Sequence, residues 1–419
     1  MGPRIIERVP ATLNFAASFT NWRAATTNAG MRPIILVAGS RGKTTVIRML
    51  DAIFRAAGLR TAIWTDLGVE IEGVRQRGEL VPWSRVCTAL DQGRLDVALQ
   101  EIDWFTIPTH GLQPEGFPVV VVTNVCANRE ACLIHGEAKL AVQLLPQVLA
   151  SAHREGLVIL NGEDFAVAGD EVPRQRQEIL TALSKETPLV RSRLAAGDIA
   201  AWAEDGTLLF GNATAPVILC HAADLHFALG GAAGFQVHNT LSAAAAAIAC
   251  GLPAHLVGEA LRSYRPSPLR TPSSFNRFDL QGITIVVSRP EPSWFLRSVL
   301  RSFRDCKRLI TTVGRLDDVP VEDVTEVGRL IGRASTAIIQ HSEHLDPSRA
   351  STLRGGIALN ELPPPIVHTT TERRAVNRAL EVARPGDGVL ILADRPVPVI
   401  RALLRAVDAS RQPPELAAD

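Results

Sequence analysis

The stretch Ile34-Ile-Leu-Val-Ala-Gly39-Ser-Arg-Gly42-Lys43-Thr44-Thr45 decides the fold of this chain. Its first five residues are apolar, which predicts a buried parallel strand. From Thr44 onwards apolar residues recur at helical spacing, so two glycines and a lysine lie in a strand-to-helix turn. In such a turn, backbone N–H groups and the helix N-terminus attract phosphate, the lysine adds a charge, and a threonine hydroxyl can bind Mg²⁺. The stretch therefore predicts a phosphate-binding loop.

The composition describes a chain long enough for two or three domains. Its 419 residues are 46% hydrophobic and 21% charged, and the net charge of +1 gives no reason to expect nucleic acid or an anionic membrane as a partner. No apolar run reaches the roughly 18 residues of a spanning helix. The six cysteines contain no C-x-x-C pair, which argues against a zinc site and a disulfide framework. We therefore expect a cytoplasmic protein without a membrane span.

Strands and helices alternate through the first two thirds of the chain. Besides the segments around the loop, the patterns predict strands at 61–66, 68–73, 95–102, 117–124 and 156–164, short strands and turns between 189 and 229, and helices at 1–32, 137–152 and from residue 238. This alternation predicts a doubly wound, mostly parallel α/β sheet, in which ligands bind at the carboxyl ends of the strands. Glu101, Asn124 and Asn161 fall at such ends.

A proline-punctuated segment from Pro266 to Ser274 predicts a domain boundary. Beyond it, strands predicted at 282–287, 308–313, 336–339 and 388–392 are separated by helices at 294–303, 321–332 and 372–383. We therefore expect an ATP-binding P-loop domain over residues 1–265 and a smaller, Rossmann-like α/β domain over residues 273–410.

Several segments resemble one known family. The G-x-x-G-K-T-T arrangement of residues 39–45 resembles the phosphate loop of the Mur ligase superfamily, and its Ser-Arg variant resembles that of capsular poly-γ-glutamate synthases. Residues 65–73 and the surroundings of Glu101 are similar to segments in the Mur-ligase-like half of cyanophycin synthetases. Asp103-Trp104-Phe105 departs from that pattern, where small and basic residues are usual. The resemblance spans residues 34–395 and weakens after 265.

The resemblance implies a set of site residues. Nucleotide contacts would come from Gly39, Ser40, Arg41, Gly42, Lys43, Thr44, Thr45, Asn124, Asn239, Arg315 and Asp317. Thr44 and Glu101 would hold Mg²⁺, and Lys43, Glu101 and Lys139 would act in catalysis, Lys139 standing where many Mur ligases carry a carbamylated lysine. His135 would be a substitute metal ligand, because Asn128-Arg129 replaces the family's Asp-His. Simpler alternatives are a solvent-facing carboxylate for Glu101, a turn for His135 and a surface lysine for Lys139.

The motifs of the C-terminal domain are altered. Pro272-Ser-Ser and Val287-Ser-Arg-Pro-Glu-Pro stand where Mur ligases have P-G-R and D-Y-A-H-N-P, and Gly314-Arg-Leu-Asp317 is similar to their G-x-R-x-D loop. We expect Arg289, Arg315 and Asp317 to be replacement contacts for substrate. His341-Ser-Glu-His344 has metal-like spacing but is interpreted as a solvated turn, and Trp83 and Trp104 as packing or rim residues.

The resemblance implies an ATP- and Mg²⁺-dependent carboxylate–amine ligase that acts through an acyl phosphate. Too few residues precede the first strand for a nucleotide-sugar domain, so we expect an amino-acid, polyamino-acid or other peptide-like substrate rather than a peptidoglycan precursor. Whether the chain forms a homo-oligomer or joins a partner subunit stays open. Two alternatives are a non-ligating ATP-binding homologue that acts as a subunit or regulator, and a small-molecule P-loop kinase, which the second α/β domain disfavours.

Overall fold

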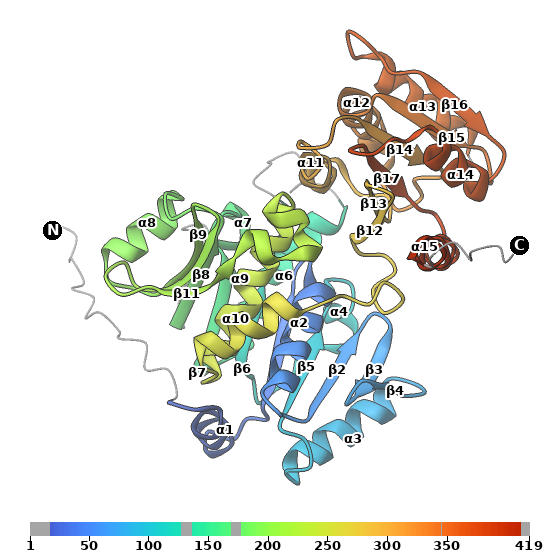
Figure 1. Cartoon of the computed structure of the whole chain (residues 1–419). Coiled ribbons are helices and arrows are strands. Elements are labelled where there is room, and N and C mark those ends of the chain that lie inside the picture. The colour runs from blue at the N-terminus through green and yellow to red at the C-terminus, as the bar shows by residue number, and fades with distance from the viewer. Residues whose placement is uncertain (1–16, 127–135, 169–176, 345, 412–419) are drawn as a thin grey trace, which may run out of the picture. The chain divides into compact units, whose positions relative to one another are not determined.

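The computed structural model describes residues 17–126, 136–168, 177–344 and 346–411. The chain divides into two compact units, residues 1–264 and residues 265–419 (Figure 1).

The first unit is built on a large, mostly parallel sheet. In the described residues this sheet has eleven strands in the order β11-β10-β9-β8-β7-β6-β1-β5-β2-β3-β4. The run from β9 to β2 in that order is parallel, and β3, β4, β10 and β11 are antiparallel extensions. The bounds are β1 Ile34–Ala38, β2 Thr61–Thr65, β3 Gly68–Ile71, β4 Val74–Arg75, β5 Val97–Glu101, β6 Phe117–Val122, β7 Ala152–Asn161, β8 Gln177–Ala182, β9 Ala200–Glu204, β10 Thr207–Gly211 and β11 Val217–His221.

Helices cover both faces of this sheet. Alternate residues of β1 point to opposite layers: Ile35 and Val37 pack with α1, α2, α9 and α10, whereas Ile34 and Leu36 pack with α3, α6 and α8. The predicted doubly wound arrangement is therefore confirmed. The bounds are α1 Phe19–Asn28, α2 Lys43–Ala56, α3 Leu80–Asp91, α4 Ile107–His110, α6 Gly136–Ala150, α7 Phe165–Ala168, α8 Pro188–Ala195, α9 Gly234–Ala249 and α10 Ala254–Ser263, with 3₁₀ turns η1 Ala222–Asp224 and η2 His226–Gly231.

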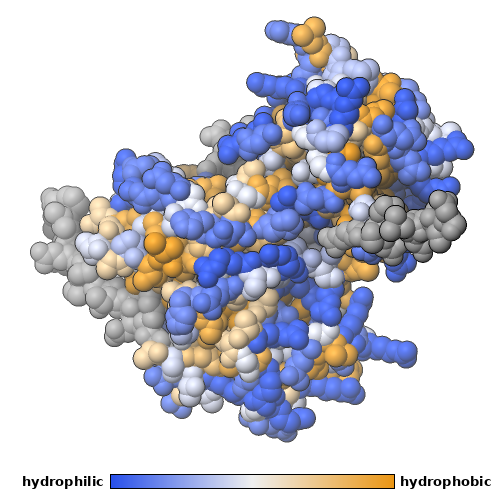
Figure 2. All heavy atoms as spheres, in the orientation of Figure 1, coloured by the Kyte–Doolittle hydropathy of each residue, from blue (hydrophilic) through white to orange (hydrophobic). Residues whose placement is uncertain are grey.

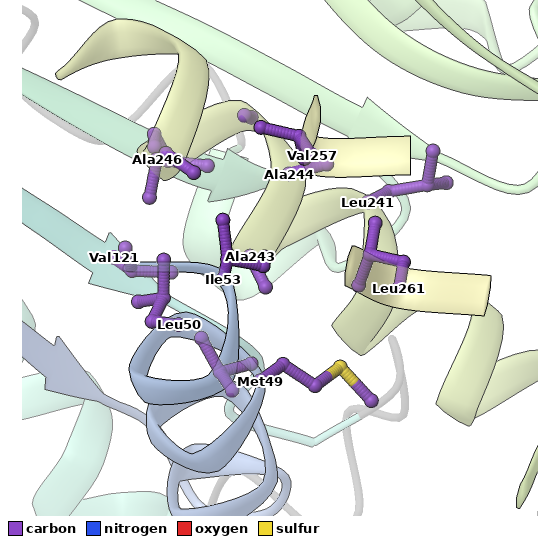
Figure 3. Packing of buried hydrophobic residues seen from close by; sticks show 14 of the residues in the cluster. Met49, Leu50, Ile53, Val121, Leu241, Ala243, Ala244, Ala246, Val257 and Leu261 are labelled. Atoms are coloured by element: carbon purple, nitrogen blue, oxygen red, sulfur yellow. The ribbon is translucent and has the colours of Figure 1, made fainter. Parts of the chain in front are cut away.

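The alanine-rich helix α9 holds α2 in place. Met49, Leu50 and Ile53 of α2 are at most 1% exposed and lie in one apolar cluster with Ala243 and Ala246 of α9 (Figure 3). Small side chains on α9 let the two helices approach closely, and a core packed in this way resists displacement of either helix. The helix that follows the predicted phosphate loop is therefore firmly positioned.

The second unit contains a smaller sheet in the order β12-β13-β17-β14-β15-β16, as far as the described residues show. β12 is antiparallel to β13, and the other pairs are parallel, which confirms the predicted second α/β fold. The bounds are β12 Asn276–Leu280, β13 Ile283–Ser288, β14 Leu309–Val313, β15 Ala337–His341, β16 Ile366–Thr369, β17 Gly388–Leu392, α11 Ser293–Arg301, η3 Val321–Asp323, α12 Val324–Ala334, α13 Pro347–Ala358, α14 Glu372–Val382 and α15 Pro396–Arg411.

Three expectations from the sequence need correction. His341 is not part of a solvated turn: it ends β15 and is 2% exposed, because β14 and β16 flank that strand. Residues 188–195 form α8 instead of a short strand or turn. Cys126 is disulfide-bonded, whereas Cys87, Cys220, Cys250 and Cys306 are free thiols.

None of the described helices combines the length and the apolar character needed to cross a membrane. On the face shown in Figure 2, apolar residues are interspersed with polar ones.

Candidate functional site

The predicted phosphate loop joins β1 to α2 at the carboxyl end of the sheet. Its strand lies between β5 and β6, which is where the connections of the sheet change direction. Ligands of open α/β sheets bind at such a switch point. α2 begins at Lys43, and Gly42 immediately before it is in the left-handed conformation with a φ of 90°.

Both glycines of the loop are required by close contacts. A β-carbon at Gly39 would lie 2.0 Å from Thr123 Oγ1, and one at Gly42 would lie 2.4 Å from Asn239 Oδ1. Asn239 comes from α9 and is buried, and its amide donates to Gln236 Oε1 at 3.2 Å. The structure thus places Asn239 directly over Gly42.

Asn124 braces the loop from the end of β6. The Ser40 N–H donates to the Asn124 carbonyl at 2.8 Å, and the Arg41 N–H donates to Asn124 Oδ1 at 3.0 Å. The Asn124 side chain in turn donates from Nδ2 to the Arg41 carbonyl at 2.9 Å. Two loop N–H groups are therefore directed at β6, and the N–H groups of the first turn of α2 are the ones available to a phosphate.

The residues predicted to hold Mg²⁺ lie together beside the loop. The Thr44 hydroxyl donates to Glu101 Oε2 at 2.8 Å, and Lys43 Nζ lies 3.8 Å from Glu101 Oε1. The Glu101 side chain is 9% exposed, so the alternative of a solvent-facing carboxylate does not hold. Burial raises the pKa of Glu101, Lys43 opposes that shift, and the nearby Asp66 adds to it.

These groups fit a magnesium ion that is shared with a nucleotide. A hydroxyl and a carboxylate are the hard oxygen ligands that Mg²⁺ prefers, and the loop is a cradle that side chains on either glycine would fill. In the described part of the chain, no group of three or more His, Cys, Asp or Glu residues could hold a metal alone. Phosphate oxygens and water would therefore have to complete the coordination, as is usual for Mg²⁺.

The remaining predicted site residues of the first unit differ in their contacts and in their exposure to solvent. Arg41 Nη1 lies 3.2 Å from Glu137 Oε2 at the start of α6 and donates to the Ser40 carbonyl at 2.8 Å. Thr45 is half-buried in the first turn of α2, and Lys139 is exposed on α6. His135, like residues 128 and 129, lies outside the described residues.

Two further residues contact the site and were not among its predicted members. Trp104 is fully buried and donates from Nε1 to Ser40 Oγ at 3.1 Å, so it is a packing residue as predicted but one that supports the loop. The buried Asp164 accepts from the N–H groups of Val125 at 2.7 Å and Cys126 at 3.1 Å, which anchors the segment after Asn124. The sequence signal was position alone: Trp104 lies just beyond a predicted strand, and Asp164 is the last residue of one.

The residues predicted in the second unit gather at the carboxyl end of its parallel strands. Arg315 follows β14, forms an ion pair with Asp317, and its N–H donates to both carboxylate oxygens of Asp394 at 3.1 Å. Arg289 follows β13, and its Nε lies 3.6 Å from Glu291 Oε1.

Sequence comparison finds relatives that are named as synthetases or ligases. No family model matches the chain. It is 27% identical to a cyanophycin synthetase of Nostoc sp. over 90% of its own length, and it spans 42% of that relative. It is 24% identical to the UDP-N-acetylmuramoyl-L-alanyl-D-glutamate--2,6-diaminopimelate ligase of Geobacter metallireducens, covering 87% of this chain and 73% of the relative.

Solved structures agree on the fold. The pseudomurein peptide ligase type C of Methanothermus fervidus superposes with a TM-score of 0.60 at 16% identity, over 89% of this chain and 78% of the other. E. coli FolC in complex with ADP gives a TM-score of 0.61 at 14% identity, over 92% of this chain and 93% of the FolC chain. With the two α/β folds, the loop geometry and these relatives in agreement, the chain has the fold of the Mur ligases and is similar in sequence to cyanophycin synthetases and Mur ligases.

Proposed function

We propose that the chain is an ATP- and Mg²⁺-dependent ligase that joins a carboxylate to an amine through an acyl phosphate. The observation that carries this proposal is the contact of Glu101 with both Thr44, at 2.8 Å, and Lys43, at 3.8 Å, beside a loop shaped for phosphate. Named relatives with ligase activity support it, although the chain spans only 42% of the first cyanophycin synthetase. We therefore extend the ligase activity of that longer protein to this chain only as a proposal.

Each residue at the loop has a task in this reaction. Lys43 and the N–H groups at the start of α2 neutralise charge on the phosphoryl group that is transferred. Mg²⁺, held by Thr44 and Glu101 together with the nucleotide, would supply further charge stabilisation. Asn124, Trp104 and Asn239 hold the loop in shape, so their effect on binding is indirect.

The second unit would supply contacts to the substrates. We assign residues 1–265 to a central ATP-binding domain and 273–410 to a C-terminal domain, with Arg289, Arg315 and Asp317 as candidate contacts to an amino-acid or polyamino-acid substrate. Arg315 and Asp317 form an ion pair with each other. A charged substrate would have to replace one residue of this pair as the partner of the other. Carbamylation of the exposed Lys139 would convert it into an oxygen ligand for a second metal. We expect the reaction to take place in the cytoplasm.

A phosphate-release assay with panels of carboxylates and amines tests the proposal. A ligase releases phosphate only when its carboxylate and its amine are both present, and mass spectrometry should detect the amide product. Lys43→Ala is the control for contaminating activity. If the purified chain binds ATP but releases no phosphate with any pair, and no added subunit restores release, the proposal fails and a non-ligating ATP-binding role replaces it. Phosphorylated acceptor without phosphate release would indicate a kinase.

A further inference from the structure

Polar residues follow one face of α2 behind the phosphate loop. Thr44, Arg48 and Asp51 are spaced so that they share the face of the helix directed at the sheet. Each of them is bonded to a different strand, β5, β3 or β2. The three pairs are Thr44–Glu101, Arg48–Glu70 and Asp51–Thr61.

The middle pair is a buried ion pair with two hydrogen bonds. Arg48 donates from Nη1 to Glu70 Oε2 at 2.8 Å and from Nη2 to Glu70 Oε1 at 2.7 Å, and the side chains are 6% and 8% exposed. Burying such a pair gains little stability over an apolar pair of the same size, but its two parallel bonds fix the geometry. The pair therefore fixes the position of β3 relative to α2.

The hairpin turn between β2 and β3 lies at the edge of the sheet where the phosphate loop follows β1. Thr65 of β2 pairs with Gly68 of β3, so Asp66 and Leu67 form a two-residue turn, and Gly68 has a φ of 102°. β2 is parallel to β5 with Trp64 opposite Gln100, which places the turn at the same edge of the sheet as the end of β5.

Asp66 at this turn lies beside the predicted metal ligand, because Trp64 of β2 is opposite Gln100 and the next residues along the two strands are Thr65 and Glu101. Asp66 is exposed, and its negative charge adds to the raised pKa of Glu101. A divalent cation between two carboxylates relieves their repulsion, and Mg²⁺ usually keeps several waters that a neighbouring carboxylate can accept hydrogen bonds from.

We propose that Asp66 is a further metal-facing residue of the nucleotide site, and that Arg48 and Glu70 are positioning residues that hold its turn against Glu101. The inference rests on the proposed function, because it requires Mg²⁺ with a nucleotide at the loop. Arg48 and Glu70 contact neither the ion nor the nucleotide and act through the position of β3.

Calorimetric titration with a non-hydrolysable ATP analogue at a series of Mg²⁺ concentrations tests the role of Asp66. Asp66→Asn should raise the Mg²⁺ concentration for half-maximal binding roughly ten-fold or more, as loss of a group that orients a metal's ligands does. Without Mg²⁺, the variant should bind the analogue as well as the wild type or better, since a negative charge near the phosphates is gone. Glu72→Gln removes a carboxylate at the other end of the hairpin and should leave the Mg²⁺ response unchanged. An unchanged Mg²⁺ response in Asp66→Asn overturns the proposal.

The double variant Arg48→Met/Glu70→Leu tests the positioning pair. An apolar pair of similar volume should keep the thermal unfolding temperature close to that of the wild type, yet the variant should need more Mg²⁺ for nucleotide binding. The double variant Arg193→Met/Glu178→Leu is the matched control, because Arg193 forms an ion pair with Glu178 at 2.6 Å elsewhere in the unit. A folded Arg48→Met/Glu70→Leu variant with the wild-type Mg²⁺ response shows that the pair does not position the site. A wild-type protein that binds the analogue identically with and without Mg²⁺ contradicts the proposed function itself.

Discussion

Replacing Gly42 with alanine should disrupt the phosphate loop for two separable reasons. Its φ of 90° is left-handed, which costs an L-residue about 1 to 2 kcal/mol. The added β-carbon would lie 2.4 Å from Asn239 Oδ1, and relieving an overpacked contact of that kind adds about 1 to 3 kcal/mol. The sum of about 2 to 5 kcal/mol corresponds to a loss of roughly 30-fold or more in nucleotide affinity if the loop must keep this shape to bind.

Gly58, at the other end of α2, is the matched control for this change. Its φ is 76° and a β-carbon there would meet nothing within 4 Å, so Gly58→Ala carries the backbone cost without the contact. Titration calorimetry with ADP should show that Gly58→Ala keeps the nucleotide affinity of the wild type. Urea unfolding should show that the same variant has a lower free energy of unfolding. Adding Asn239→Ala to Gly42→Ala should recover the contact part of the lost stability and leave the backbone part. Wild-type nucleotide affinity in Gly42→Ala would refute the reasoning.

Three further predictions concern single side chains. Lys43→Ala and Thr44→Ala should each lower the affinity for Mg²⁺–ATP, or turnover, by orders of magnitude with unchanged circular dichroism; unchanged ATP binding in both would rule out the phosphate-loop assignment. Because burial raises the pKa of Glu101, nucleotide binding that depends on Mg²⁺ should weaken as the pH falls through that raised pKa, and the residual binding of Glu101→Gln should show no such loss in calorimetric titrations. Burial lowers the pKa of His238 from 6.5 to about 4, so the unfolded chain takes up a proton at a higher pH than the folded chain. The stability present at neutral pH is therefore lost as the pH falls from 6.5 towards 4. In urea unfolding, the free energy of unfolding of His238→Asn should fall less over this pH range than that of the wild type.

The sequence by itself determined the local elements and the type of chemistry. The apolar run Ile34–Ala38, the glycines of the loop and the spacing of the following apolar residues are properties of near neighbours in the chain, which is why the strand, turn and helix are predictable. Glu101 was predicted for the same reason, since a polar residue that ends an apolar run marks the carboxyl end of a strand.

The tertiary structure decided which distant residues meet at those elements. The strand order β1-β5-β2 brings Asp66 to Glu101, packing of α9 on α2 brings Asn239 onto Gly42, and neighbouring strands bury His341. Periodicity reports which face of a strand or helix is buried, but it carries no information on which strand lies beside which. Contacts between segments far apart in the chain depend on that order, so Asp66 became visible as a site residue only in the folded sheet.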